Sequence, residues 1–386
     1  MKQHTTTETG KSKVTKATIR EIRKQASQQK LTIGLDLGDR STHFCILNEQ
    51  GEILMEDQLA TTKTGWNRLF EKLASTRVAM EAGTHSPWAS RHLSSLGHEV
   101  IVANPRQVAM ISDSKRKNDR IDAEKLARLA RVDPELLCPI QHRSEQAQQD
   151  LAHIRVRNEL VQARTSLINA ARGQAKSLGH RLEKCDADQA GVEMTKEFPE
   201  PIQAILNPML ELAAEITVKI KAAEQKIHQI AQRYSKDLKV LDAICGVGEL
   251  TSLAFALTID EKQRFGKSRQ IGPYLGMVPG QSQSGARDPQ QRITKQGDRM
   301  MRFLLVQCAH CILRRDAPDC DLKRWGWSKI EVLKNGKGKP RKKKVIVAVA
   351  RKLAVLMHRL WVSGEVYDPL YNAKQQAALA KSKTAA

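Results

Sequence analysis

Aromatic residues and long apolar runs are both scarce in this sequence. Phe, Trp and Tyr make up 4% of the 386 residues, so open aromatic platforms on which bases could stack are not expected to dominate any binding surface. No apolar run approaches the roughly 20 residues that a membrane-spanning helix needs. The opening MKQHTTTETGKSK also lacks the apolar core of a secretory signal. We therefore expect neither a membrane protein nor a secreted one.

Cysteine gives no sign of a disulfide framework. The seven cysteines are odd in number and scattered, which indicates a reducing compartment. Cys308 and Cys311 form a CxxC, but VQCAHCIL around them has an apolar helical pattern. No second ligand pair follows at the spacing of a zinc finger. We therefore expect buried thiols there and no zinc site.

Acidic residues are too few to balance the basic ones. The 64 Lys and Arg outnumber the 42 Asp and Glu, giving a net charge of +22. A polyanion is the expected partner, because Lys and Arg release counterions from a phosphate backbone. The run KNGKGKPRKKK (334–344) adds to this charge, and its glycines and proline predict a loop. Its candidate nucleic-acid contacts are Lys339, Arg341, Lys342, Lys343 and Lys344.

The first part of the chain has the pattern of a mixed α/β domain. Residues 1–28 are interpreted as a basic flexible tail, partly helical at most, and residues 29–144 as the domain. Strands are predicted at 31–38, 42–48, 52–58, 77–82 and 99–105, with helices at 65–75 and 86–96. Three strands followed by alternating helices and strands are the order of an RNase H-like fold.

From about residue 145 the strand patterns end. Long helices are predicted at 145–178 and 209–234, joined by a loop with Pro199, Pro201 and Pro208. Apolar positions of the second helix alternate three and four apart, as in a coiled coil; they are Ala213, Ile216, Ile220, Ala223, Ile227, Ile230 and Tyr234. This helical coiled-coil region, 145–235, could self-associate or form an antiparallel hairpin within one chain. A mostly helical module (236–372) and a tail (373–386) follow.

Four acidic residues stand where few structural reasons explain them. Asp36 lies inside LTIGLDLG, between apolar neighbours near the end of a predicted strand, and Glu81 lies near the end of RVAMEA, although an ionised carboxylate is costly to desolvate. Asp119 and Asp122 are three apart, so on a helix they share one face about 5–6 Å apart. Taken singly, Asp119 could be an N-cap and Asp122 a first-turn acid. Together the four predict a site for Mg²⁺. The cations beside the pair are candidate phosphate contacts: Lys115, Arg116, Lys117 and Arg120.

Two glycine-containing segments of the second half could approach phosphate. In CGVG, Gly246 and Gly248 could present free N–H groups at a helix start, although a helix C-cap would use the same glycine. In GQSQSGARDPQQRITKQG, Ser284 precedes Gly285, whose backbone freedom could let the serine reach a phosphate. A loop serine is ordinarily a turn former and a weak nucleophile. Nearby cations that could neutralise phosphate charge are Arg287, Arg292 and Lys295.

These motifs, in this order, resemble one known family. GLDLG, MEAGT and KNDRIDAEKLA resemble the N-terminal half of the DEDD transposases, encoded by the "one-ten" family of bacterial insertion sequences with its "eleven-eleven" branch and related to the Piv/MooV DNA invertases. LDAICGVGELTSLAF resembles the helix-hairpin-helix-like segment of that family. PGQSQSGARDPQQRITKQGDRMMRFLLVQCA resembles its serine-containing module. The resemblance covers roughly residues 30–365.

The resemblance implies a RuvC-like N-terminal domain whose DEDD tetrad, Asp36, Glu81, Asp119 and Asp122, binds Mg²⁺ or Mn²⁺. It implies that Ser284 joins a DNA strand through a phosphoserine bond, with Ser282 as a second candidate in SQSGARDP. It also implies donor and target DNA, a structured noncoding guide RNA and homodimers that assemble into tetramers. The protein would then be bacterial, cytoplasmic and associated with the nucleoid.

A transposase or recombinase that uses both sites is the favoured interpretation, and three others stay open. A site-specific DNA invertase shares the same resemblance. A RuvC-like nuclease or resolvase would use water as the nucleophile and leave Ser284 structural. A non-catalytic nucleic-acid-binding protein would use the carboxylates only as helix caps, and the tetrad argues against it.

Overall fold

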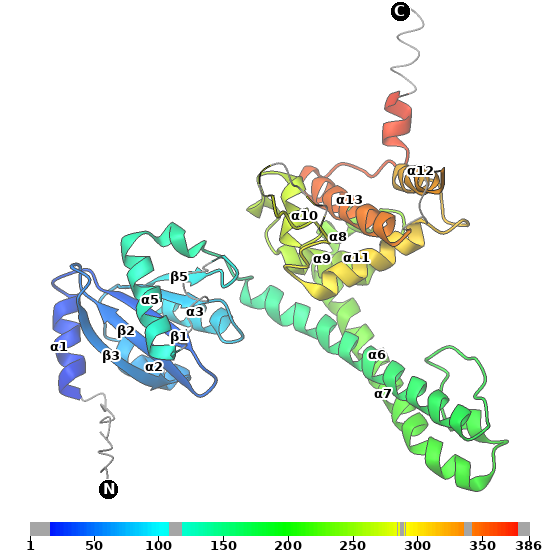
Figure 1. Cartoon of the computed structure of the whole chain (residues 1–386), viewed down its shortest axis with the longest axis horizontal. Helices are drawn as coiled ribbons and strands as arrows, with labels where there is room; N and C mark the ends of the chain where they lie inside the picture. Colours follow the sequence, from blue (N-terminus) through cyan, green and yellow to red (C-terminus); the bar gives the residue numbers. More distant parts are fainter. Residues whose placement is uncertain are drawn as a thin grey trace, which may run out of the picture. The chain divides into compact units, whose positions relative to one another are not determined.

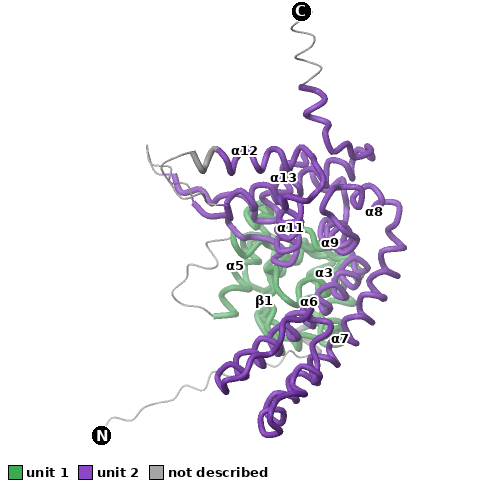
Figure 2. The backbone as a smooth tube through the Cα atoms, turned by 90° about the vertical axis from the view of Figure 1, so that its right-hand side faces the viewer, with its two compact units in different colours: residues 1–142 green, residues 143–386 purple. Residues whose placement is uncertain are grey.

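The chain folds into two compact units, residues 1–142 and 143–386 (Figures 1 and 2). The computed structural model describes residues 16–107, 118–283, 285, 289, 291–335 and 342–376. Each unit has a hydrophobic core of its own. Among the helices of this described part, none combines the length and apolar character that crossing a bilayer requires.

Unit 1 is built on a five-stranded mixed sheet in the order β3-β2-β1-β4-β5. The strands are β1 (Thr32–Leu37), β2 (Ser41–Leu47), β3 (Ile53–Ala60), β4 (Arg77–Glu81) and β5 (Glu99–Ala103). β1, β2 and β3 form an antiparallel meander, and β4 and β5 continue the sheet in parallel with β1. The predicted mixed α/β sheet is confirmed, and its strand order matches that expected of an RNase H-like domain.

Helices cover both faces of this sheet (Figure 1). They are α1 (Lys16–Ala26), α2 (Lys63–Phe70), α3 (Ser86–Ser95) and α5 (Asp119–Val132). Ile33 and Leu35 of β1 pack into the large core with α1, α2 and α3. On the opposite face α5 packs directly on the sheet, and Ala123 and Ala127 belong to a small buried cluster with Cys45 of β2. Alternation along each strand therefore decides which layer a side chain meets.

Two helices of unit 1, α1 and α2, differ from the predicted boundaries. Residues 16–26 of the predicted flexible tail form α1, in which Ile22 is only 3% exposed and belongs to the main core. Residues 16–26 are therefore part of the folded unit, because the apolar side of the helix packs into its core. The helix predicted at 65–75 begins earlier, at Lys63, since the Thr62 side chain accepts a hydrogen bond from Gly65 N and caps it.

Unit 2 begins with two long helices that lie side by side (Figure 1). They are α6 (Glu145–Ser177) and α7 (Glu200–Arg233). The apolar stripe predicted for α7 packs inward within the chain: Ala213 meets Ile168 of α6, and Ile227 and Ile230 join the core of the C-terminal module. The structure thus has the intramolecular hairpin that the sequence left as one alternative.

Helix α7 starts nine residues earlier than the predicted 209. Pro201 lies in the first turn, where a missing N–H costs nothing. Pro208 lies inside the helix, and burial of Leu206 and Leu210 against α6 holds the flanking turns in place. Tertiary packing therefore overrides the local preference of proline for a helix end.

The rest of unit 2 packs around α9 (Figure 1). Its helices are α8 (Ser235–Asp242), α9 (Glu249–Ile259), α10 (Ile271–Tyr274), α11 (Arg299–Ile312), α12 (Asp321–Asn335) and α13 (Lys342–Ser363). Every residue of α9 from Thr251 to Ile259 is buried. This explains why its sequence is apolar all round rather than on one stripe.

Three predictions for this module need correction. Cys308 is buried, as predicted, but Cys311, nearly one turn further along α11, is exposed. Lys342, Lys343 and Lys344 form the first turn of α13 rather than a loop, while Lys339 and Arg341 fall outside the described residues. The predicted tail from 373 begins with helical residues, and Ala373 N donates to Asp321 Oδ1 at 3.3 Å.

The close approach of α5 to β1 generates a stability prediction. A Cβ atom on Gly34 would lie 2.0 Å from Ala123 O and 2.5 Å from Ala127 N, and backbone atoms cannot move aside as a flexible side chain can. Gly34→Ala is expected to lower the free energy of unfolding by about 3 kcal/mol or more, measured by chemical denaturation. Gly83→Ala is the matched control, since no atom lies within 4 Å of its Cβ position. Equal stability of the two variants would contradict this packing.

Candidate active site

Two of the four predicted carboxylates lie on neighbouring strand ends. β1 and β4 are parallel and paired, so their C-terminal ends lie at the same edge of the sheet. Gly34 of β1 faces α5, so Asp36, two residues on, lies on the same face. Ala79 of β4 packs in a buried cluster with Leu126 and Ala130 of α5, so Glu81, two residues further along the strand, lies on that face as well.

The other two carboxylates come from the first turn of α5. The N-cap is Asn118, whose side chain accepts a hydrogen bond from Arg120 N at 3.2 Å, so Asp119 is not the cap. The Asp119 side chain is 72% exposed, and its Oδ2 lies 3.9 Å from His43 Nε2. Asp122 is more enclosed, and its Oδ1 is buried without a hydrogen-bond partner, 3.7 Å from Lys125 Nζ. An unsatisfied carboxylate oxygen of this kind needs a further cationic or hydrogen-bonding partner.

The four groups share one electrostatic environment. Burial and then the negative charges of Asp119, Asp122 and Glu81 raise the pKa of Asp36 to about 6, against 3.8 ordinarily, while His43 lowers it. The other three predicted acids therefore all act on Asp36. Within the part of the chain that the structure describes, no three His, Cys, Asp or Glu side chains are already arranged to hold a metal ion. The donor set nevertheless fits a hard divalent cation, because it is all oxygen, mutually repelling and in part unsatisfied.

Of the four cations predicted beside the acid pair, the structure describes Arg120. Arg120 is 64% exposed and its guanidinium lies 3.4 Å from Glu56 Oε2 on β3, so it is engaged within the sheet domain. Lys115, Arg116 and Lys117 lie outside the described residues.

The same edge carries polar groups that sequence reasoning missed. Trp88 Nε1 donates to His85 Nδ1 at 3.2 Å. The ring proton of His85 is thereby on Nε2, which donates to Asp39 Oδ1 at 3.2 Å. His43 stands opposite Asp36 in the β1–β2 register. That register could have been obtained from the short turn between the two strands, since pairing outward from it places residue 43 against residue 36.

In unit 2, the serine-containing segment leaves the core as a narrow hairpin. Its two arms bridge at Pro279 and Ile293, and Thr294 N donates to Val278 O at 2.9 Å. Glycines let the two ends cross: a Cβ on Gly276 would lie 1.9 Å from Gln296 O, and one on Gly297 would lie 2.1 Å from Tyr274 O. The base of the hairpin is therefore compatible only with glycine at both crossing points.

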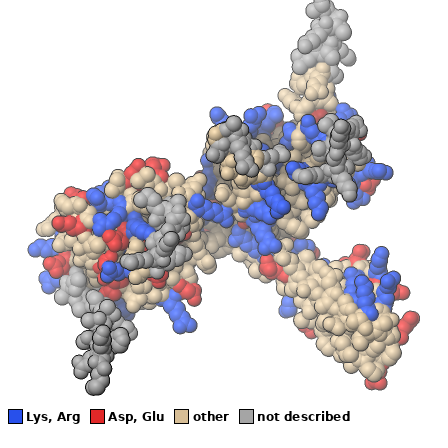
Figure 3. Space-filling view, viewed as in Figure 1, with Lys and Arg blue, Asp and Glu red and all other residues tan. Residues whose placement is uncertain are grey.

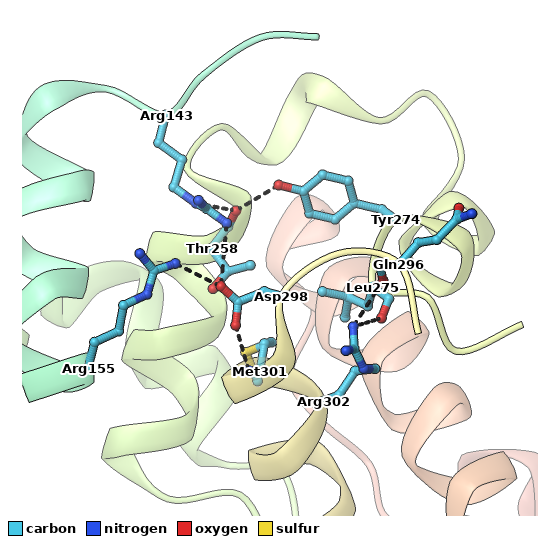
Figure 4. A network of polar contacts seen from close by, with 9 residues as sticks. All are labelled: Arg143, Arg155, Thr258, Tyr274, Leu275, Gln296, Asp298, Met301 and Arg302. Atoms are coloured by element: carbon cyan, nitrogen blue, oxygen red, sulfur yellow. Dashed lines mark hydrogen bonds and ion pairs between the residues drawn. The ribbon is translucent and has the colours of Figure 1, made fainter. Parts of the chain in front are cut away.

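Charged side chains fasten this base to the helices around it (Figure 4). Asp298 caps α11 by accepting from Met301 N at 2.9 Å, and it pairs with Arg155 of α6 at 2.9 Å. Arg302 donates from one Nη1 to Leu275 O at 3.0 Å and to Gln296 O at 2.9 Å. Both arms of the hairpin are thus tied to α11, and α11 is tied to α6.

The structure describes some of the predicted residues of the hairpin and not others. Ser282 is exposed, and Gly285 has a φ of 56°, in the left-handed region that glycine favours. Ser284 and Arg287 lie outside the described residues. Arg292 and Lys295 are on the returning arm, and Lys295 itself has a φ of 56°. Lys and Arg side chains gather over α11 and α13 on the same module (Figure 3).

The CGVG turn connects α8 to α9, as predicted. Gly246 has a φ of 79°, and its Cβ would lie 2.7 Å from Ile312 Cγ1, so this glycine lets the turn pack against α11. Gly248 is the N-cap of α9. Glu249 in the first turn pairs with His228 at 3.0 Å, which places a carboxylate where a phosphate was expected to approach.

Comparison with known proteins adds an independent line of evidence. A DEDD-type model of the IS110 group, described as a transposase, matches residues 33–180, and a model described as the transposase IS116/IS110/IS902 family matches residues 238–322. The first match contains all four acidic residues; the second contains the hairpin and the CGVG turn. Together they span more than half of the chain.

Individual proteins of similar sequence are also named as transposases. A probable family 20 transposase of Pseudomonas aeruginosa is 29% identical over 305 residues, 76% of this chain and 87% of that protein. The transposase for insertion sequence element IS1111A of Coxiella burnetii is 26% identical over 346 residues, 87% and 90% respectively. The transposase for IS1328 of Yersinia enterocolitica is 27% identical over 287 residues, 73% and 84%.

The raised pKa of Asp36 predicts a pH-dependent stability. An acid whose folded pKa exceeds its unfolded value binds more protons when folded, so its contribution to stability falls as pH rises from about 4 to about 6. Asp36→Asn should therefore stabilise the metal-free chain by about 1 kcal/mol at pH 8, a value discounted for a half-exposed group, and by less at pH 5. Calorimetric melting of both proteins, with Asp39→Asn as control, measures the difference. A gain independent of pH would contradict the repulsion.

The clamp at the hairpin base predicts a change in protease sensitivity. Arg302→Ala removes two charge-assisted hydrogen bonds to the carbonyls of Leu275 and Gln296, each worth about 1.5–3 kcal/mol. Limited trypsin digestion should then cut within 276–297 at least about 10 times faster, because local opening costs less. Lys323→Ala, on α12, is a control expected to leave that rate unchanged. Unchanged cleavage in Arg302→Ala would show that the glycine crossing alone holds the base.

Proposed function

The chain belongs to the IS116/IS110/IS902 family of transposases, and from that membership we propose that it cuts and rejoins DNA using a divalent-metal site in unit 1 and a serine nucleophile in unit 2. The observation that supports the metal half is the electrostatic convergence of Asp119, Asp122 and Glu81 on Asp36. Two strand ends and one helix start bring four acids together inside a chain of net charge +22.

These acids would hold Mg²⁺ or Mn²⁺ through their carboxylate oxygens. A divalent cation there would polarise the scissile phosphate and stabilise charge on its oxygens. Asp36 and Asp122, the more enclosed members, would fix the position of the ion, while the exposed Asp119 stands where a phosphate can enter. The His43 imidazole beside Asp119 would orient that carboxylate.

The serine half rests on the hairpin of unit 2. We propose that the Ser284 hydroxyl attacks the phosphorus, so that a P–O bond to serine forms and the P–O bond to one deoxyribose breaks. The serine proton passes to a base, and the departing deoxyribose oxygen gains one. The phosphoserine ester conserves the bond energy for rejoining. Arg287, Arg292 and Lys295 on the hairpin would neutralise the charge that develops on the phosphate.

Several partners and details belong to the same proposal. We propose donor and target DNA as substrates, a structured noncoding guide RNA as the element that selects the target, and homodimers that assemble into tetramers near the nucleoid. A guide RNA would leave the protein to hold backbones, which suits its abundant Lys and Arg. We further propose that α6 and α7 act as a coiled-coil arm and that α8, the CGVG turn and α9 act as a helix-hairpin-helix-like element.

A gel assay for covalent protein–DNA adducts tests the serine chemistry. With end-labelled donor and target DNA, RNA transcribed from the element's flanks and Mg²⁺, the wild type should give a labelled band that protease removes. Ser284→Ala should abolish this band, and Asp119→Asn should reduce it by about 100-fold or more. Ser282→Ala is the matched control in the same loop and should retain it.

The other outcomes assign different chemistry. Metal-dependent cleavage without an adduct, unchanged in Ser284→Ala, would leave a RuvC-like nuclease and refute the serine mechanism. An adduct lost only in Ser282→Ala would transfer the role to that residue. An adduct whose yield is the same with Mg²⁺ or with chelator, and in Asp119→Asn, would refute the metal half.

A further inference from the structure

Phe303 of α11 is exposed between two hollows of different chemistry in unit 2. Its side chain is 51% exposed, although large aromatic residues are few in this chain. A hollow of about 450 Å³ lies on one side of it and another of about 320 Å³ lies on the other, and Phe303 lines both. No acidic side chain of the described residues lines either hollow.

The larger hollow is electrically neutral and rich in hydrogen-bonding groups. Leu250, Met300 and Leu304 form its apolar wall with Phe303. Opposite them, uncharged polar side chains follow one face of α6 at helical spacing: Asn158, Gln162, Thr165, Ser166 and Asn169. The single cation in the lining, Arg157, is already paired with Glu224 at 2.5 Å.

Part of this polar row has no hydrogen-bond partner within the described part of the chain. Among the described residues, the side chains of Asn158, Ser166 and Asn169 form no hydrogen bond with another residue. Amide groups offer both donors and acceptors, as the edges of unpaired nucleobases require. The hollow thus combines an aromatic face with hydrogen-bonding edges opposite it.

The smaller hollow is cationic. Lys295, Arg299 and Arg302 line it together with apolar side chains including Met277 and Val306. The three cations surround the base of the serine-containing hairpin, since Lys295 is on its returning arm and Arg302 binds its backbone. A phosphate is the group that such a cluster would attract.

We propose that the two hollows bind one unpaired nucleotide of a single-stranded nucleic acid, with its base stacked on Phe303 against the polar row of α6 and its phosphate at Lys295 and Arg299. Only a ligand with a flat, hydrogen-bonding part joined to an anionic part matches both hollows and the aromatic ring between them. A second copy of this chain, with net charge +22, would bring further cations toward an already cationic surface.

This inference rests on the proposed function in one respect, that a nucleic acid is the partner. It adds a location for an unpaired nucleotide, which would bind beside the hairpin base and not at the carboxylates of unit 1. It requires neither the metal site nor the serine, so it can fail or stand independently of both.

Binding of short oligonucleotides to the full-length chain tests the site. The probes are fluorescent oligouridylate and oligothymidylate of about twelve nucleotides, and an abasic oligomer of the same length. Phe303→Ala should weaken binding of both base-containing probes about 10-fold and leave the abasic probe unchanged, because only stacking is lost. Phe303→Tyr should restore binding, while Phe303→Leu, which is apolar but not aromatic, should not. The ratio between the two base-containing probes tells whether RNA or DNA is preferred.

Matched variants separate the two hollows. Asn169→Ala should weaken the base-containing probes selectively, and Arg299→Ala should weaken all three probes and reduce the salt dependence by about one charge. Val218→Ala is the surface control, since this α7 side chain is 68% exposed and lines neither hollow.

Two results would overturn the proposal: unchanged affinity in Phe303→Ala, or an equal loss of affinity for the abasic probe. Unchanged affinity together with a changed sedimentation coefficient would in addition assign the surface to a second copy. If the wild type forms the serine adduct while Phe303→Ala binds all probes normally, only this inference fails. If Phe303→Ala loses base-dependent binding but no adduct ever forms, the serine chemistry fails and the nucleotide site stands.

Discussion

The contact between α5 and β1 governs where the candidate metal ligands lie. With no side chain on Gly34, the backbone of α5 can rest on the strand itself. A helix held that close begins over the strand end, so the carboxylates of its first turn come within electrostatic reach of Asp36, as Glu81 does from the neighbouring strand. The position of the site thus depends on the absence of a Cβ atom at Gly34. The repulsion among the acids costs stability, which the core on the opposite face of the sheet has to offset.

Unit 2 fixes its serine-containing hairpin by different means. There the backbone itself crosses at Gly276 and Gly297, and Arg302 occupies the carbonyls that the crossing leaves open. Asp298 then connects this base to α6 through Arg155. One half of the proposed chemistry therefore depends on close helix–strand packing and the other on a closed polar network, so the two halves can be disabled separately by substitution.

Patterns that repeat along the chain were predictable, and features set by tertiary contact were not. Alternating apolar residues gave the five strands, and the spacing of Asp119 and Asp122 placed both on one helical turn. The internal position of Pro208 could not be foreseen, because burial of its neighbours decides it. The helix formed by residues 16–26 was hidden by its charge, since it is anchored in the core by only a few side chains, among them Ile22 and Ala26. The hydrogen bonds of His85 required the fold of the strand edge, which no local pattern encodes.

The inward packing of the α7 stripe has a consequence for how such a chain can diversify. Ala213 and Ile227 pack against other residues of the same chain. Separate apolar residues lie on the outward sides of the paired helices: Val156 on α6 is 59% exposed and Val218 on α7 is 68% exposed. Inner and outer faces of one helical pair are then under separate selection. Substitutions on the outer faces can change which surfaces of two molecules meet without disturbing the packing of α6 against α7. The choice of partner and the stability of the fold can therefore evolve at different rates.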